Sequence, residues 1–153
     1  MNQAELTFFN MFDDIRKSNR EEDMFGHYDF IIADRIKVDV KGAKKINRWD
    51  EEPNHEIHYV EFRNVKGNDG WVLGKADYIA FEYNDTFLLV KRIALKELCL
   101  NKIKSKEILN VKKLYQYYRR EGREDIITLV PTKDIIGITT RILSKKQKYP
   151  IKK

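Results

Sequence analysis

Apolar and polar residues alternate through residues 36–41, which is typical of a β-strand with one buried face. The apolar face carries Ile36, Val38 and Val40, and the polar face carries Lys37, Asp39 and Lys41. An apolar run at residues 30–32 precedes this strand, and residues 33–35 form a polar break between the two. We therefore predict a hairpin with a turn of two or three residues centred near Asp34.

The other apolar patterns predict strands and helices around this hairpin. Further strands are expected at residues 56–63, 78–82, 86–90 and 123–130, and helices at residues 3–18, 94–108, 111–121 and in a short segment from Thr132. The first three strands are expected to form a meander. This order predicts an α/β fold with a mixed sheet of about five or six strands, flanked by helices.

Length and composition favour one folded domain. The chain has 153 residues, of which 42% are hydrophobic, so it can bury a core of its own. We expect one domain over residues 1–143 and a basic tail over residues 144–153. Cys99 is the single cysteine, which excludes an internal disulfide and favours a buried, structural role. No secretion signal and no membrane-spanning apolar run is evident, which predicts a cytoplasmic protein without membrane association.

The net charge of +6 favours a polyanionic partner, and DNA is the partner we expect. Basic residues cluster after the hairpin, and one more precedes a later strand; the candidates for phosphate contact are Lys44, Lys45, Arg48 and Lys75. Trp49 lies within the cluster and either stacks on a base or covers an edge of the core.

The hairpin also brings acidic residues together. Asp29 precedes the first strand, and the turn sets it opposite Asp39 or Val40, with Lys41 on the same face as Asp39. Opposed like charges destabilise a hairpin unless something compensates them. A hard divalent cation such as Mg²⁺ or Mn²⁺ does so, because it takes oxygen ligands and commonly one or two carboxylates. The alternative is an ordinary hairpin whose outer face carries these charges.

This pattern resembles the PD-(D/E)xK nuclease superfamily, in which an acid at the start of one strand is followed by a tight turn and by acid-x-lysine in the next strand. Tyr28 stands where many members have a proline. The resemblance covers roughly residues 1–92 and extends to the strand at residues 126–130, and the small members that act alone on branched DNA, such as Holliday junction resolvases, are the most similar. It implies a restriction-endonuclease-like fold, with Asp29, Asp39 and the Val40 carbonyl as metal ligands and Lys41 orienting the attacking water.

Two glutamates are further candidates for this site. The resemblance implies that Glu5, on the predicted first helix, adds a metal ligand; alternatively, Glu5 is an acid favoured by the positive end of the helix. Glu61 is either a ligand or water-holding group on a strand next to the hairpin, or a cross-strand partner of a lysine. His55 and His58 have the spacing of zinc ligands but lack further ligands nearby, so zinc is not expected.

The expected function is therefore metal-dependent hydrolysis of DNA phosphodiester bonds by an endonuclease. The alternatives are a ribonuclease, or a catalytically inactive nucleic-acid-binding or protein-interaction domain with the same fold. A homodimer is expected because cutting two strands requires two sites. The two predicted helices carry more apolar and aromatic side chains than a single small core can bury. Those available for a dimer contact are Phe8, Phe9, Met11 and Phe12, or Leu114, Tyr115, Tyr117 and Tyr118.

Overall fold

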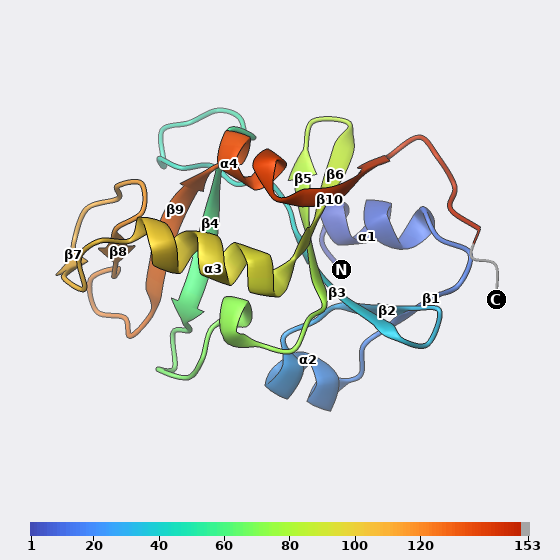
Figure 1. Ribbon diagram of the computed structural model, residues 1–153, viewed down its shortest axis with the longest axis horizontal. Helices are drawn as coiled ribbons and strands as arrows, with labels where there is room; N and C mark the ends of the chain where they lie inside the picture. The colour runs from blue at the N-terminus through green and yellow to red at the C-terminus, as the bar shows by residue number, and fades with distance from the viewer. Residues whose placement is uncertain (151–153) are drawn as a thin grey trace.

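The computed structural model describes residues 1–150 and contains two β-sheets with helices packed around them (Figure 1). The larger sheet has six strands, and its spatial order is β1 (Ile15–Lys17), β2 (Phe30–Ile32), β3 (Ile36–Lys41), β5 (Tyr78–Tyr83), β6 (Thr86–Lys91) and β10 (Thr139–Ser144). Strands β3 and β5 are parallel, and the other neighbours in this sheet are antiparallel. The predicted mixed sheet in an α/β fold is confirmed.

A second sheet and five helical segments complete the fold. The second sheet has the order β4 (Ile57–Arg63), β9 (Ile126–Pro131), β8 (Tyr117–Tyr118) and β7 (Ile108–Leu109). The helical segments are α1 (Gln3–Asn10), α2 (Arg20–Gly26), the 3-10 turn η1 (Trp71–Leu73), α3 (Arg92–Lys102) and α4 (Thr132–Gly137). Among residues 1–150, no helix has the length and apolar character needed to cross a membrane.

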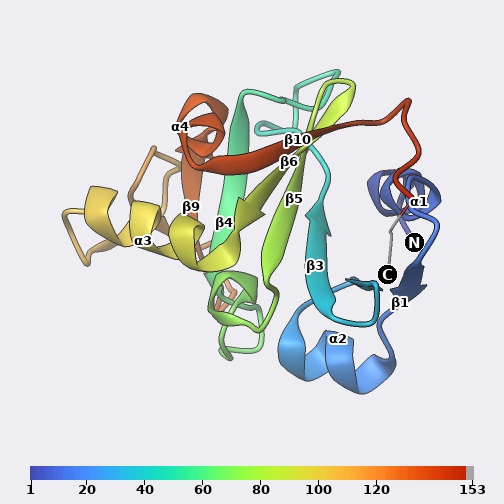
Figure 2. The same ribbon diagram turned by 45° about the vertical axis from the view of Figure 1, so that its right-hand side comes forward.

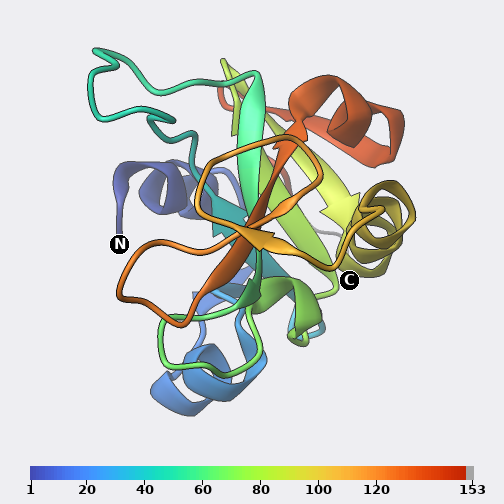
Figure 3. The same cartoon turned by 90° about the vertical axis from the view of Figure 1, so that its left-hand side faces the viewer.

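Two hydrophobic clusters hold these layers together. The larger lies between the two sheets and α3, and includes Val60, Phe81, Leu95 and Val130. The smaller lies between the first sheet and α1, where Phe8 packs against Phe30 and Phe87. In Figure 2, α1 lies on one side of β3, and β4 and β9 lie beyond β5 on the other. Figure 3 shows the loops around β7 and β8 in front of β9.

Because side chains alternate along β3, one face of the strand contacts the cluster under α1 and the other faces the cluster between the sheets. Val38 and Val40 join the cluster under α1, whereas Ile79 and Phe81, the β5 partners of Asp39 and Lys41, belong to the cluster between the sheets. Asp39 and Lys41 therefore lie on the face directed toward the second sheet.

The N-terminal helix is shorter than predicted. An Asn2–Glu5 capping box starts α1, and the helix ends at Asn10 instead of continuing to residue 18. Asp13 and Asp14 would lie near the negative end of a longer helix, which is unfavourable. The chain instead forms β1, which pairs with β2. The following segment forms α2 behind a second capping box at Asn19.

The predicted helix at residues 111–121 is absent, and its apolar residues form strand contacts instead. Leu114 makes a bridge to Leu129, and Tyr118 in β8 pairs with Ile127 in β9. Apolar residues at helical spacing here pair with a neighbouring strand instead, because tertiary contacts override a weak local preference. Likewise, α3 ends at Lys102, and the segment after α4 forms β10, in which Thr139, Thr140 and Ile142 favour a strand.

The predicted three-strand meander is wrong. Strand β4 lies in the second sheet beside β9, and the neighbour of β3 is β5. The long connection of residues 42–56 carries the chain from one sheet to the other. Strand β4 buries His58, Val60 and Phe62, a face that packs between the sheets.

The aromatic residues of α1 are not available as a surface patch. Phe8 and Met11 are buried, and Phe9 and Phe12 pack partly buried against the smaller cluster. Residues near the end of the described chain add to this contact, because the Tyr149 ring lies 5.5 Å from the Phe12 ring and the Tyr149 amide donates to the Met11 carbonyl. This part of the dimer argument is therefore wrong.

Candidate metal centre and active site

The β2–β3 turn fixes the position of Asp29. Ala33 and Asp34 both have positive φ, as the turns that suit hairpin twist require. The resulting register pairs Phe30 with Val38. The Asp29 amide donates to the Val38 carbonyl over 2.9 Å, and the Asp29 carboxylate accepts from the Val40 amide over 2.8 Å. Asp29 is thus bonded to the backbone on both sides of Asp39.

The two aspartate carboxyl groups share a buried environment. Burial, followed by the charge of Asp39, raises the pKa of Asp29 to about 8. Asp39 is 4% exposed, and burial raises its pKa as well. The pair therefore retains a proton at neutral pH when no cation compensates it.

Lys41 lies next to the two aspartates, on the same face of β3 as Asp39. Its Nζ lies 3.2 Å from Oδ2 of Asp39 and 4.9 Å from the centre of the Trp71 ring. Burial alone would lower the pKa of Lys41, but the Asp39 and Asp29 carboxylates outweigh it, and the pKa is raised. Lys41 is therefore a cation at neutral pH, suited to contact with a negatively charged oxygen.

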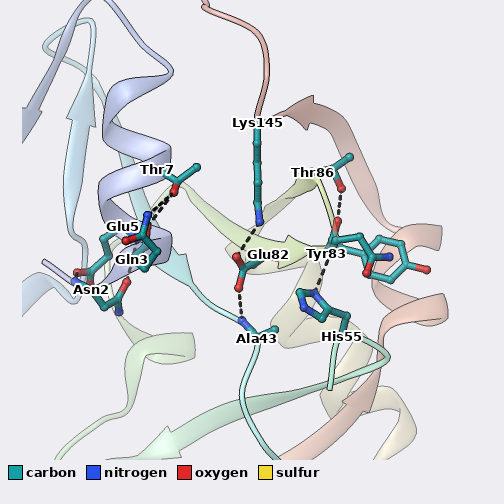
Figure 4. A network of polar contacts seen from close by, with 11 residues as sticks. Asn2, Gln3, Glu5, Thr7, Ala43, His55, Glu82, Tyr83, Thr86 and Lys145 are labelled. Carbon is teal, nitrogen blue, oxygen red and sulfur yellow. Dashed lines mark hydrogen bonds and ion pairs between the residues drawn. The ribbon is translucent and has the colours of Figure 1, made fainter. Parts of the chain in front are cut away.

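Glu82 on β5 holds the chain where it leaves β3. Its carboxylate accepts from the Ala43 amide over 2.9 Å and from Lys145 Nζ over 2.7 Å (Figure 4). Burial alone would raise the pKa of Glu82, but these two hydrogen bonds lower it. A charged carboxylate thus fixes the backbone two residues after Lys41.

Glu5 has the helix-start role that the sequence left open, and it also lies beside the candidate metal site. Its carboxylate accepts from the Asn2 amide over 3.0 Å within the capping box (Figure 4). Glu5 also lines a cavity of about 390 Å³ together with Asp23 and Asp29. The structure therefore brings Glu5 to the cavity beside Asp29, while its carboxylate is engaged at the helix start.

Glu61 lies across from Lys41, on the second sheet. Its strand neighbour is Ile127, so the predicted cross-strand pair with a lysine is absent. Burial raises the pKa of Glu61, and the Lys41 charge and a hydrogen bond from the Trp71 amide oppose this rise. Glu61 therefore belongs to the electrostatic environment of Lys41, although it comes from a different sheet.

The oxygen atoms at the hairpin suit a magnesium ion. Within residues 1–150, no three His, Cys, Asp or Glu side chains cluster tightly enough to form a metal site by themselves. Asp29, Asp39 and the Val40 carbonyl provide hard oxygen donors, and Mg²⁺ usually completes its shell with water and substrate phosphate. A buried carboxyl next to a half-buried one is a setting that a divalent cation would stabilise, so these residues fit the ion.

The predicted phosphate contacts separate into two groups. Lys44 lines a cavity with Lys41, whereas Lys75 lines a different cavity beside Met24 and Phe25. Lys45 is exposed on the loop after β3. The Arg48 guanidinium stacks 4.3 Å from the Trp49 ring, and Trp49 is 79% exposed, so Trp49 does not cover the core.

Sequence reasoning missed several residues at this site. His58 is 3% exposed and lines the cavity that contains Lys41, and within the described part of the chain its Nε2 atom has no hydrogen-bond partner. Lys112 and Arg120, from the segment predicted as a helix, lie near Lys44 across a second cavity. Basic and tyrosine residues interleave in residues 112–120, which is a signal for nucleic-acid contact, but the helix prediction did not place them beside Lys44.

No protein-family model matches the chain, and neither a curated protein nor a solved structure is significantly similar to it. The interpretation of the site therefore rests on the geometry and chemistry of its own residues.

Proposed function

We propose that the protein is a metal-dependent DNA endonuclease with a restriction-endonuclease-like arrangement of its first sheet. The observation that carries this proposal is the position of Asp29, which bonds to the backbone on both sides of Asp39, together with Lys41 at 3.2 Å from Asp39. A buried carboxyl, a half-buried carboxyl and an ammonium group, all on one hairpin, are an arrangement suited to phosphodiester hydrolysis.

Asp29, Asp39 and the Val40 carbonyl would hold Mg²⁺ or Mn²⁺. When bound, the ion supplies positive charge to a phosphate oxygen and lowers the pKa of a water molecule. Lys41, which is protonated, donates to a phosphate oxygen or orients the water. In hydrolysis the water oxygen bonds to phosphorus, the bond to one ester oxygen breaks, and the water proton passes to solvent or to a carboxylate such as Glu61.

DNA is the proposed substrate, and branched DNA is the form to test first. The net charge of +6 favours a polyanion, and Lys44 lies on the Lys41 side of the site. RNA presents the same phosphates, so it belongs in the same experiment.

A second copy of the chain would supply the second site that cleavage of both strands requires. The larger exposed apolar side chains include Phe25, Met24 and Val65, which border one cavity. We propose a homodimer, to be tested by light scattering with and without DNA; a monomer in both conditions would leave cleavage of one strand as the activity.

A nucleic-acid-binding domain without catalysis is the second candidate. It is favoured by the ion pair between Asp39 and Lys41, which partly satisfies the buried carboxylate without a metal. In that case the charged group would be structural, and DNA would bind without being cut.

The deciding experiment is incubation with duplex, single-stranded and four-way-junction DNA and with RNA, in Mg²⁺ or Mn²⁺. Cleavage that EDTA and Asp29→Asn abolish supports the enzyme. Asp34→Asn is the matched control, because Asp34 is an exposed acid in the turn of the same hairpin. Intact substrates at high protein concentration would contradict the proposal.

A further inference from the structure

A cavity of about 270 Å³ lies beside the candidate active site, and it draws its lining from the second sheet and the loops around it. We call it the inter-sheet cleft; it is lined by Lys44, Tyr59, Glu61, Trp71, Lys112, Tyr118, Arg120 and Ile127. Glu61, Ile127 and Tyr118 lie in one row across β4, β9 and β8. This sheet is formed by chain segments outside the hairpin that carries the acidic pair.

Lys44 and Lys112 are the cations of the inter-sheet cleft that remain open to an anion, whereas Arg120 pairs with Asp125. Among residues 1–150, no carboxylate lies within ion-pair distance of Lys44 or Lys112. Burial, followed by the charge of Lys41, lowers the pKa of Lys44, and Arg120 acts in the same direction, whereas the charges of Glu61 and Asp39 oppose this shift. A phosphate would relieve this repulsion between cations.

Arg120 and Lys112 are held in place by protein groups. Asp125 is completely buried and accepts from Arg120 Nε over 2.8 Å and from its terminal nitrogen over 2.7 Å. Lys112 donates to the Ile46 carbonyl and lies 5.6 Å from the Tyr59 ring centre. These contacts orient the cations before any ligand arrives, which reduces the entropy lost on binding.

The rings of the cleft add a second kind of contact. Tyr59 and Tyr118 are half-buried, so each ring has an accessible part within the cleft. The Tyr59 hydroxyl donates to the Ile46 carbonyl over 3.3 Å, which restrains the ring. Aromatic rings next to cations are the combination that binds unpaired bases and their phosphates.

The cleft adjoins the cavity that contains Lys41. Lys44, Tyr59 and Trp71 line both the inter-sheet cleft and this smaller cavity. His58 also lines the smaller cavity, and among residues 1–150 its buried Nε2 has no hydrogen-bond partner. A nucleotide bound in the cleft would therefore lie next to the Lys41 side of the candidate active site.

The size of the cleft distinguishes an unpaired nucleotide from a duplex. A volume of about 270 Å³ is close to the lower end of the roughly 300–1,000 Å³ of small-molecule sites. A double helix, whose major groove alone is about 12 Å wide, does not enter a space of that size. A single base with its phosphate matches the rings and cations that are present.

We propose that the inter-sheet cleft binds an unpaired nucleotide of a DNA strand, with its base against Tyr118 and Tyr59 and its phosphate on Lys44, Lys112 and Arg120. The position of this nucleotide next to the scissile phosphate rests on the proposed nuclease function. Binding of single-stranded DNA in the cleft does not require catalysis.

The test measures binding of a labelled oligothymidylate and of a blunt duplex in EDTA, where cleavage is prevented. Tyr118→Leu removes the ring, and Tyr118→Phe keeps it. We expect Tyr118→Leu to weaken single-strand binding roughly tenfold, as loss of a stacking ring does, and Tyr118→Phe to change it by less than about twofold. Blunt duplex binding should stay the same in both variants.

A second pair of variants tests the phosphate contact. Lys112→Gln should weaken single-strand binding and reduce the magnitude of the salt slope by about 1. Lys102→Gln, at an exposed lysine on α3, should leave both unchanged. Thermal melting of each variant checks that the fold is retained.

The outcomes separate this proposal from the nuclease. Equal single-strand affinity in Tyr118→Leu and Tyr118→Phe, or equal losses on the blunt duplex, would overturn the cleft proposal even if cleavage is observed. Tighter binding of oligouridylate than oligothymidylate would overturn DNA as the ligand. Ring-dependent binding of oligothymidylate without any cleavage would support the cleft and count against the nuclease.

Discussion

Asp29 donates its amide to the residue before Asp39 and accepts, through its carboxylate, from the residue after it. The hairpin backbone itself therefore holds the two carboxyl groups together. This arrangement does not depend on a ligand, so its electrostatic cost is present in the metal-free protein.

We predict that Asp29→Asn stabilises the metal-free protein above neutral pH. The folded pKa of Asp29 is about 8, above its ordinary value of 3.8. The folded state thus keeps a proton that the unfolded state releases, and stability falls as pH rises from about 4 to about 8. Asparagine does not titrate, so the stability of the variant does not fall with pH in this way. Its side-chain oxygen can still accept a hydrogen bond from the Val40 amide.

The measurement is urea unfolding in EDTA at pH 5 and pH 9. At pH 9 the free energy of unfolding of the variant should exceed that of the wild type by about 1 kcal/mol or more, which corresponds to a shift of one pKa unit. Asp34→Asn serves as the control. A large loss of stability in Asp29→Asn at pH 9 would mean that the carboxylate is structural.

The same substitution should remove stabilisation by metal. An ion that binds only the folded wild type raises its melting temperature in proportion to the logarithm of its concentration. We expect millimolar Mg²⁺ or Mn²⁺ to raise the melting temperature of the wild type and of Asp34→Asn, and to leave Asp29→Asn unchanged. Equal shifts in all three proteins would place the ion elsewhere.

Asp39 and Lys41 should show strong energetic coupling. Lys41→Met leaves the 4%-exposed Asp39 without its ammonium partner. Breaking a buried ion pair from one side typically costs about 3–5 kcal/mol, whereas replacing both partners costs much less. We therefore expect Asp39→Asn to restore part of the stability lost in Lys41→Met.

A double-mutant cycle on the free energy of unfolding measures this coupling. Additive effects of the two substitutions would show that the ion pair contributes little. Cleavage should be lost in the two single variants and in the double variant, because the charged groups are needed in catalysis whether or not the fold is restored.

His58 should make the protein sensitive to mild acid. Burial lowers the pKa of His58 to about 4, so the folded state binds fewer protons than the unfolded state between about pH 6.5 and pH 4. The stabilisation that comes from keeping His58 neutral is complete above pH 6.5. As the pH is lowered through this window, the free energy of unfolding falls by a few kcal/mol at most. His58→Phe should show a shallower decline between pH 7 and pH 4, measured by urea unfolding. Parallel curves for the two proteins would contradict this assignment.

Glu82 should affect catalysis through the backbone at Ala43. Glu82→Gln keeps an oxygen for the Ala43 amide, whereas Glu82→Ala loses both this hydrogen bond and the Lys145 pair. We expect Glu82→Ala to lower kcat by 10- to 100-fold, as small displacements near a site can do, and Glu82→Gln to lower it much less. Equal losses in the two variants would indicate that charge, and not the position of the backbone, is what matters.

The hairpin could be predicted from the sequence because its information is local. Alternation in residues 36–41 and the short polar turn determine both its strands and its register. Strand β4 was also found, but its placement beside β9 depends on residues about seventy positions away. No local pattern specifies that choice, so Glu61 was assigned to the wrong sheet although it lies near Lys41.

The inter-sheet cleft depends even more on contacts between distant parts of the chain, which local sequence patterns do not specify. Lys44, Lys112 and Arg120 come together only because β8 and its loops pack beside β9. The apolar spacing of residues 111–121 fits a helix as well as short strands, and the positive φ of Tyr115 that interrupts it is not encoded in a periodic pattern. Neighbouring strands therefore decided the structure of this segment.

The Glu82 contacts connect parts of the chain that a ribosome produces at different times. Glu82 joins Ala43 to Lys145, and β10 covers the edge of β6 only after residues 139–144 are made. A nascent chain that has reached β6 can form the acidic hairpin and the Glu82–Ala43 hydrogen bond, but not the Lys145 contact. We expect a chain halted at that stage to hold Glu82 less firmly, so residues that are made late complete the support of the candidate site.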